Sequence, residues 1–108
     1  MRRPVRWSRA ALEDLKSQID YIAADNPEAA RRVSKRIGVA AADLGHMSTG
    51  RPGRVSRTYE KVVKGLPYVI TYAIISQSAG EAISILRVIH AARNWPDEAW
   101  PEPDYSKD

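Results

Sequence analysis

Two helical segments joined by a very short connection constrain the fold of this chain most strongly. Residues 8–24 place apolar side chains at helical spacing on one side and charged side chains largely on the other. Residues 27–44 repeat this pattern, with alanine-rich contact positions. Ser8 and Asn26 are good helix N-caps, and Pro27 suits the first position of a helix. Because the connection is so short, we expect an antiparallel helix hairpin.

After the hairpin the periodicity changes from helical to alternating, which is typical of strands. Gly45 is expected to end the second helix in a left-handed conformation, and the glycine-rich residues 45–54 to form the main loop. Lys64-Gly65 can turn between the second and third strands. We expect strands over residues 5–7, 54–63, 66–75 and 83–89. The fold class is therefore α+β, with an N-terminal strand and a two-helix antiparallel hairpin packed on a small antiparallel β-sheet.

Composition and charge divide the chain in two. Residues 96–108 contain five acidic residues and one lysine, a net charge of −4, which leaves +8 for residues 1–95. We expect one domain over residues 1–95, followed by an acidic, proline-rich tail over residues 96–108, extended or disordered. Trp100 and Tyr105 can anchor that tail against the domain. A basic domain attracts polyanions or acidic protein surfaces.

Several classes of function are disfavoured by what the sequence lacks. No cysteine and only two histidines, His46 and His90, leave little material for a metal site, and no phosphate-binding glycine loop is present, so we expect no metal and no cofactor. No run reaches the roughly 20 apolar residues that a membrane span needs. The N-terminus lacks the apolar segment of a secretory signal, so we expect a cytoplasmic protein without a membrane partner.

The last strand raises the question of function, because an arginine stands among its aliphatic residues. Strand alternation places Leu86 and Val88 on one face, and Ile85, Arg87 and Ile89 on the other. A buried unpaired arginine is costly, so we expect the helices to cover Leu86 and Val88. Arg87 would then lie on an open apolar face that suits a partner.

The charged and aromatic residues of the last strand and of the main loop also have a purely structural interpretation. The Arg87 stem can simply cover its aliphatic neighbours, and His90 can be a hydrogen-bonded residue at a strand end. Trp95 can pack under the edge of the domain. Arg51 and Arg54 can belong to a solvated loop.

Four segments in order resemble the RelE/ParE superfamily of bacterial toxins, and its ParE branch most closely. They read "WSRAALEDLKSQIDYIAADNPEAA", "GRPGR", "LPYVITYAI" and "ISILRVIHAARNWP" and lie within residues 5–96. The resemblance implies a toxin of a type II toxin–antitoxin module, of the plasmid-stabilisation kind, that inhibits DNA gyrase by binding. It also implies a ParD-like antitoxin with a ribbon-helix-helix domain, through which alone the complex would contact operator DNA. The antitoxin's C-terminal segment would bind as a helix in a groove, with an added edge strand possible.

We therefore expect the basic, aromatic and aliphatic residues of the loop and the last strand to bind the target or the antitoxin. These candidates are Arg51, Arg54, Arg57, Tyr59, Ile85, Arg87, Ile89, His90, Arg93 and Trp95.

The RelE branch of the superfamily implies a different activity, ribosome-dependent cleavage of messenger RNA. Such cleavage needs a base, an acid and cations around the phosphate. The chain lacks the C-terminal histidine–tyrosine pair found in some of these ribonucleases, and Tyr105 lies too far into the tail to replace it. A non-enzymatic toxin is therefore favoured, and a non-toxic antitoxin-binding scaffold is a third hypothesis. Candidates for the ribonuclease site are Arg54, Arg57, Lys61, Arg87 and His90, with Glu60 as a possible base.

Overall fold

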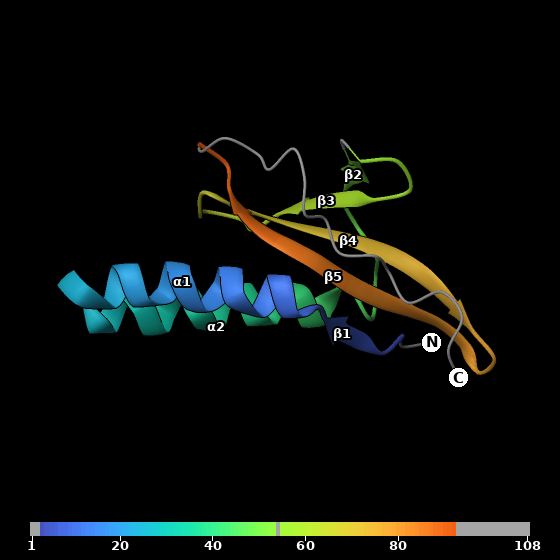
Figure 1. The fold of residues 1–108 in the computed structure, drawn as a ribbon, viewed down its shortest axis with the longest axis horizontal. Coiled ribbons are helices and arrows are strands. Elements are labelled where there is room, and N and C mark those ends of the chain that lie inside the picture. The colour runs from blue at the N-terminus through green and yellow to red at the C-terminus, as the bar shows by residue number, and fades with distance from the viewer. Residues whose placement is uncertain (1–2, 54, 93–108) are drawn as a thin grey trace.

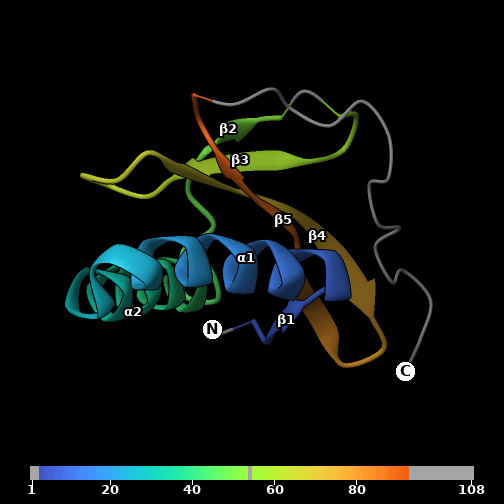
Figure 2. The same ribbon diagram turned by 60° about the vertical axis from the view of Figure 1, so that its left-hand side comes forward.

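A helix hairpin covers one face of a five-stranded sheet in the computed structural model, which describes residues 3–53 and 55–92 (Figure 1). The helices are α1 (Arg9–Asp25) and α2 (Pro27–Asp43). The strands, in the sheet order β1-β5-β4-β3-β2, are β1 (Val5–Trp7), β5 (Gly80–His90), β4 (Tyr68–Gln77), β3 (Tyr59–Val62) and β2 (Arg51–Pro52). The turned view places both helices on the same side of the sheet (Figure 2). The predicted tail and Arg54, Arg93 and Trp95 lie outside the described residues.

Ser8 and Asn26 cap the N-terminal ends of the two helices, as the sequence predicted. Ser8 Oγ accepts a hydrogen bond from the Ala11 amide at 3.0 Å. Asn26 Oδ1 accepts one from the Ala29 amide at 3.1 Å, and Pro27 occupies the start of α2. Each cap satisfies an amide that the first turn of a helix leaves without a partner. The antiparallel hairpin is confirmed.

The sheet is mixed rather than purely antiparallel. Strands β3, β4 and β5 form the expected antiparallel meander, but β1 pairs in parallel with β5, so that Val5 faces Ile83. Strand β2 pairs with β3 in the region that we expected to be loop, and β3 is shorter than residues 54–63. Gly65 has a φ of 78° in the turn between β3 and β4, as the Lys64-Gly65 prediction requires.

The prediction that Gly45 ends the second helix in a left-handed conformation is wrong. Its φ is not positive, and α2 ends instead with Leu44 in a right-handed conformation. A Cβ at Gly45 would lie 2.5 Å from the carbonyl oxygen of Arg3, while the Arg3 amide donates to the Gly45 carbonyl at 2.7 Å. Glycine is therefore required at this position by the close approach of the N-terminal segment.

Aliphatic side chains from α1, α2 and the three central strands form the core between the helices and the sheet. Its fully buried members include Ala11, Ile37, Ala41, Leu44, Val63, Ile70, Tyr72, Ile83, Ile85 and Val88. Among these, Tyr72 also donates a hydrogen bond from its hydroxyl to the Thr49 carbonyl at 2.7 Å. This bond ties the loop before β2 to the core.

An irregularity of register in β5 decides which of its side chains face the helices. The shift between Thr71 and Tyr72 of β4 leaves Leu86 without a pairing partner, which is a β-bulge. The bulge interrupts the alternation, so Ile85 before it and Val88 after it both join the core beneath the helices. The prediction that the helices cover Leu86 and Val88 is confirmed for Val88 and wrong for Leu86, which does not belong to the core beneath the helices. The prediction that Ile85 lies on an open face is wrong, since Ile85 is fully buried.

Candidate partner-binding site

Arg87 belongs to the contact between α1 and β5, not to an open face. Its Nε and Nη2 donate to the two carboxylate oxygens of Asp14 at 2.7 and 2.8 Å. The hydrogen bonds that Arg87 donates to Asp14 raise the pKa of Arg87 and so stabilise the charged guanidinium. The expectation that Arg87 avoids the helices is therefore wrong, because Asp14 of α1 supplies the bidentate partner that offsets the cost of desolvation.

The same helix closes the part of the β5 edge that extends beyond β1. Ser8 Oγ donates to the Leu86 carbonyl at 2.9 Å, and Gln18 Nε2 donates to the Val88 carbonyl at 2.9 Å. Asp14 also accepts from the Val88 amide at 3.0 Å. We call these contacts the α1–β5 junction. Because side chains of α1 take up its free backbone groups, this edge offers little to an added strand.

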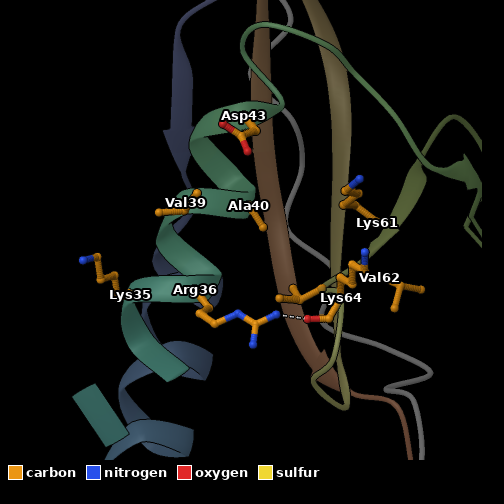
Figure 3. Close-up of a pocket in the computed structure, with 9 residues that line it drawn as sticks. Lys35, Arg36, Val39, Ala40, Asp43, Lys61, Val62 and Lys64 are labelled. Carbon is orange, nitrogen blue, oxygen red and sulfur yellow. Dashed lines mark hydrogen bonds between the residues drawn. The ribbon is translucent and has the colours of Figure 1, made fainter. Parts of the chain in front are cut away.

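A groove lies on the other side of the hairpin, between α2 and β3 (Figure 3). Its volume is about 370 Å³. Four cations and one carboxylate surround an aliphatic surface in which Val39 is 52% exposed. The lining residues are Lys35, Arg36, Val39, Ala40 and Asp43 from α2, and Lys61, Val62, Val63 and Lys64 from β3 and its turn. We call this site the α2–β3 groove.

Arg36 bridges the groove at the end near the β3–β4 turn. Its guanidinium donates to the Lys64 carbonyl, and Figure 3 shows the side chain reaching across from α2. A Cβ at Gly65 would lie 3.2 Å from Arg36 Nη2, so the glycine leaves room for this side chain. Ala40 points toward the strand side of the groove, whereas Lys35 and Val39 lie on the outer side of the helix. The site therefore continues from the groove onto the exposed surface of α2.

The predicted loop and β3 residues are held by separate contacts. Arg51 forms an ion pair with the buried carboxylate of Glu60, with Nη2 and Oε1 3.1 Å apart. The Tyr59 ring stacks on Tyr72 with centroids 5.5 Å apart. Arg57 is exposed in the loop before β3, with a φ of 67°. These residues are not among those that line the groove.

The predicted residues at the end of β5 are likewise engaged within the domain. His90 meets Tyr68 edge to face with ring centroids 5.4 Å apart, and its Nδ1 accepts from the Ala92 amide at 3.2 Å. Ile89 is only 6% exposed. The hydrogen-bonded, structural interpretation of His90 agrees with this geometry.

Sequence reasoning missed the groove. Lys35 and Arg36 were assigned to a basic solvent face, and Val39 lies outside the apolar stripe of α2. An aliphatic residue outside the stripe, one turn from two cations, was the available signal. Similarly, Asp14 and Gln18 are four positions apart in α1, and this spacing places both on the helix face that meets β5.

Two kinds of site have no counterpart in the described residues. Neither helix has the length and apolar content of a membrane span. Within residues 3–53 and 55–92, no three His, Asp or Glu side chains lie close enough to share a metal ion.

The architecture, a helix hairpin on one face of a small mixed sheet, is that of ParE-type toxins. A chain of the chromosomal ParDE toxin–antitoxin system of P. aeruginosa superposes with a TM-score of 0.73 at 23% identity, over 82% of this chain and 95% of that one. A YoeB/ParE toxin from Agrobacterium tumefaciens gives a TM-score of 0.53 at 8% identity, over 79% of this chain and 94% of the other. These likenesses confirm the expected fold.

Sequence comparisons define the family. The model of the ParE toxin of type II toxin–antitoxin systems, parDE, matches residues 5–95. Y4kP of Sinorhizobium fredii, named as a candidate toxin, is 41% identical over 96 residues, 88% of this chain and 95% of the relative. Toxin RelE2 of Caulobacter vibrioides is 36% identical over 89 residues, 82% of this chain and 96% of the relative. The chain therefore belongs to the ParE toxin family of type II toxin–antitoxin systems.

Proposed function

We propose that this toxin is neutralised by a cognate ParD-like antitoxin, which lays an acidic, partly apolar segment into the α2–β3 groove. The observation that carries this proposal is the composition of the groove, four cations and one carboxylate around exposed aliphatic surface. An acidic amphipathic segment would bury the aliphatic surface and match the charge. Free of the antitoxin, the toxin inhibits DNA gyrase by binding it in the cytoplasm, and operator DNA is contacted only through the antitoxin.

The contrast between the two sides of the hairpin supports the groove as the entry point. At the α1–β5 junction, Ser8, Asp14 and Gln18 already satisfy backbone groups of β5. A partner there would have to displace buried hydrogen bonds, each of which is costly to leave unmade. Binding at the groove needs no such exchange, since Val39 and the ammonium groups at its rim face solvent.

The antitoxin proposal is tested with the protein encoded by the neighbouring reading frame. Lys35→Glu combined with Lys64→Glu reverses two charges at the rim, and we expect binding to weaken by about tenfold or more, which is 1.4 kcal/mol or more. The matched control is Arg9→Glu combined with Arg32→Glu, which also reverses two exposed charges but lies outside the groove. Isothermal titration calorimetry gives both affinities. Equal affinities for the two variants and the unaltered chain would remove the groove from the interface.

Inhibition of gyrase is supported by membership of the ParE family and is tested separately. Purified toxin is added to gyrase and relaxed plasmid, and loss of supercoiling is expected at a modest molar excess of toxin. Addition of the antitoxin should restore supercoiling. Full supercoiling at a large excess of active toxin would exclude gyrase as the target.

A ribosome-dependent endoribonuclease is the second candidate, and the 36% identity to a toxin named RelE2 favours it. Three of the described candidates for that site have different structural partners: Asp14 for Arg87, Thr49 for Lys61, and Tyr68 for His90. Primer extension on translated messages during growth arrest distinguishes the two activities. Cuts that disappear with His90→Ala would establish cleavage, and intact messages would exclude it.

The hypothesis of a non-toxic scaffold differs from the toxin proposal in whether expression of the chain alone arrests growth. Such a chain would bind the antitoxin tightly without arresting growth when expressed alone. Arrest on expression, relieved by the antitoxin, is the result that the toxin proposal requires.

A further inference from the structure

The face of the sheet opposite the helices carries a second apolar cluster. Strand alternation places Val69, Ala73 and Ile75 of β4 and Ile89 of β5 on this face, and Val69 pairs directly with Ile89. None of the four belongs to the core beneath the helices, and neither does the bulge residue Leu86. We call these five residues the distal cluster. Apart from Thr71, whose hydroxyl donates to the Arg87 carbonyl, strand β4 is therefore apolar on both faces over residues 68–75.

The distal cluster is buried, although the described chain places no second layer over it. Ala73, Ile75, Leu86, Val69 and Ile89 are 0%, 1%, 2%, 3% and 6% exposed. Both helices lie on the opposite side, as Figures 1 and 2 show, and all five strands belong to one sheet. A sheet with one uncovered face normally alternates apolar and polar residues, which β4 does not do. Burial of these side chains requires a cover.

The cover is limited in extent. Val62 of β3 is 49% exposed, whereas its pairing partner on β4, Val69, is 3% exposed. The covered area therefore follows β4 and β5 and does not include the end of β3. A strip of this shape fits a single extended segment better than a broad protein surface.

We propose that the C-terminal segment of this chain, residues 93–108, covers the distal cluster. It begins three residues after β5 ends, so its first residues start beside the cluster. Extended, its 16 residues span about 50 Å. The β4–β5 hairpin, with strands of 10 and 11 residues, is about 35 Å long. The segment can therefore run along the whole strip.

The composition of the segment suits this role. Trp95, Trp100 and Tyr105 recur at intervals of five residues, and rings of this size each bury about 150–250 Å². Three prolines in the segment disfavour a helix and reduce the conformational entropy that docking removes. Its five acidic residues are attracted to residues 1–92, whose net charge is +7. The inference goes beyond the proposed function, since it makes the distal face an intramolecular contact.

Paramagnetic relaxation tests the contact, because the chain contains no cysteine and can be labelled at one chosen position. A nitroxide attached to Ala99→Cys should strongly broaden the amide signals of Val69, Leu86 and Ile89. The control label at Ala79→Cys, exposed in the β4–β5 turn about 30 Å along the strands from the Val69–Ile89 pair, should leave the signals of that pair intact. Sharp signals from the distal cluster with the Ala99→Cys label would overturn the proposal.

A mixed sample separates a contact within one chain from a contact between two chains. Spin-labelled chain without isotope is mixed with isotope-labelled chain without a nitroxide, and the distal signals should remain sharp. Broadening in this sample would mean that a second copy provides the cover, which would also overturn the proposal.

A second measurement uses the full chain with Trp95→Ser and Trp100→Ser together. Uncovering the distal cluster should increase the fluorescence of an added hydrophobic dye several-fold. The control, Tyr21→Ser, removes an aromatic ring that is already 73% exposed and should leave dye fluorescence unchanged. Equal dye fluorescence for the two variants would count against the proposal.

Discussion

The two helices of the hairpin contact the sheet in different ways. Helix α1 and its N-cap contact β5 through hydrogen bonds that Ser8 and Gln18 donate and that Asp14 accepts, and these bonds engage backbone groups of Leu86 and Val88. Helix α2 contributes aliphatic side chains to the same core, yet it leaves a groove of about 370 Å³ beside β3. Charged residues are present on both sides. At the junction they are paired within the chain, whereas most of those at the groove line an exposed rim.

This difference shows that a charge on a strand does not by itself mark a binding surface. Arg87 is the most conspicuous charge of β5, and Asp14 already binds it. Lys35 and Lys64 are unremarkable in sequence, and they border exposed aliphatic surface. Among the described residues, Arg87 is paired with a carboxylate, whereas Lys35 and Lys64, the proposed binding residues, are not, and this difference depends on the fold.

The largest effect is expected from removing the carboxylate of the junction. Asp14→Ala removes the two hydrogen bonds that the carboxylate accepts from the guanidinium of Arg87, which is 20% exposed, and also removes the acceptor of the Val88 amide. We expect the free energy of unfolding to fall by about 3 kcal/mol. Thermal or denaturant unfolding measures this loss. The control is Asp20→Ala, whose ion pair with Lys16 is exposed, and it should have little effect. Similar stabilities for the two variants would mean that the junction does not hold α1 in place.

Two glycine substitutions near the groove, one in the β3–β4 turn and one in α2, should change the free energy of unfolding in opposite directions. Gly65→Ala places a side chain at a φ of 78° and against Arg36, and we expect a loss of about 1–2 kcal/mol. Gly38→Ala, in α2, meets no atom within 4 Å and should stabilise the protein by about 0.5–1 kcal/mol. Denaturant unfolding of both variants checks the signs. A stabilising Gly65→Ala would contradict the account of the turn that borders the groove.

The Tyr72 hydroxyl provides a pH-dependent test of the core beside β3. Burial, reinforced by neighbouring Tyr59, raises the pKa of Tyr72 above its usual value. The folded state therefore holds this proton more tightly than the unfolded state, so stability is complete below about pH 10 and decreases above it. Tyr72→Phe should remove the late part of the tyrosinate titration followed by ultraviolet absorbance. It also removes the bond to Thr49, for a loss of about 1 kcal/mol. An unchanged titration curve would assign the late proton to another tyrosine.

The smallest effect on stability is expected at the groove itself. Val39→Ser changes a side chain that is 52% exposed, and we expect a change within about 0.5 kcal/mol. Binding of the antitoxin should nevertheless weaken, because the aliphatic surface is lost. If Val39→Ser lowered stability and left antitoxin binding unchanged, the groove would be a structural contact like the α1–β5 junction, and the contrast between them would be wrong.

The helix hairpin and the meander could be predicted because their signals are local. Ser8 and Asn26 cap the helices that follow them, and the short apolar run of residues 66–75, bounded by turn residues, predicts a buried strand. The resemblance to the RelE/ParE superfamily added the family and the order of elements. These features depend on residues only a few positions apart.

The site could not be predicted because its parts are distant in sequence. Asp14 and Arg87 are separated by 73 positions, so the periodicity of the strand alone cannot predict that this arginine is paired. The bulge at Leu86 has no sequence mark in β5, yet it places Ile85 and Val88 on the same face. The groove depends on how far α2 stands from β3, which is set by the packing of the whole core.

The pairing of β1 with β5 affects how the protein is made. Val5 meets Ile83, and the Ser8 amide donates to the Ile85 carbonyl at 3.0 Å, so the first strand is completed by the last. A nascent chain that ends before residue 83 contains no partner for β1. Contacts of such long separation form slowly, since loop-closure entropy opposes them. The N-terminal strand therefore stays unpaired during synthesis until β5 has been made, and the sheet can assemble only after residues 83–85 are available.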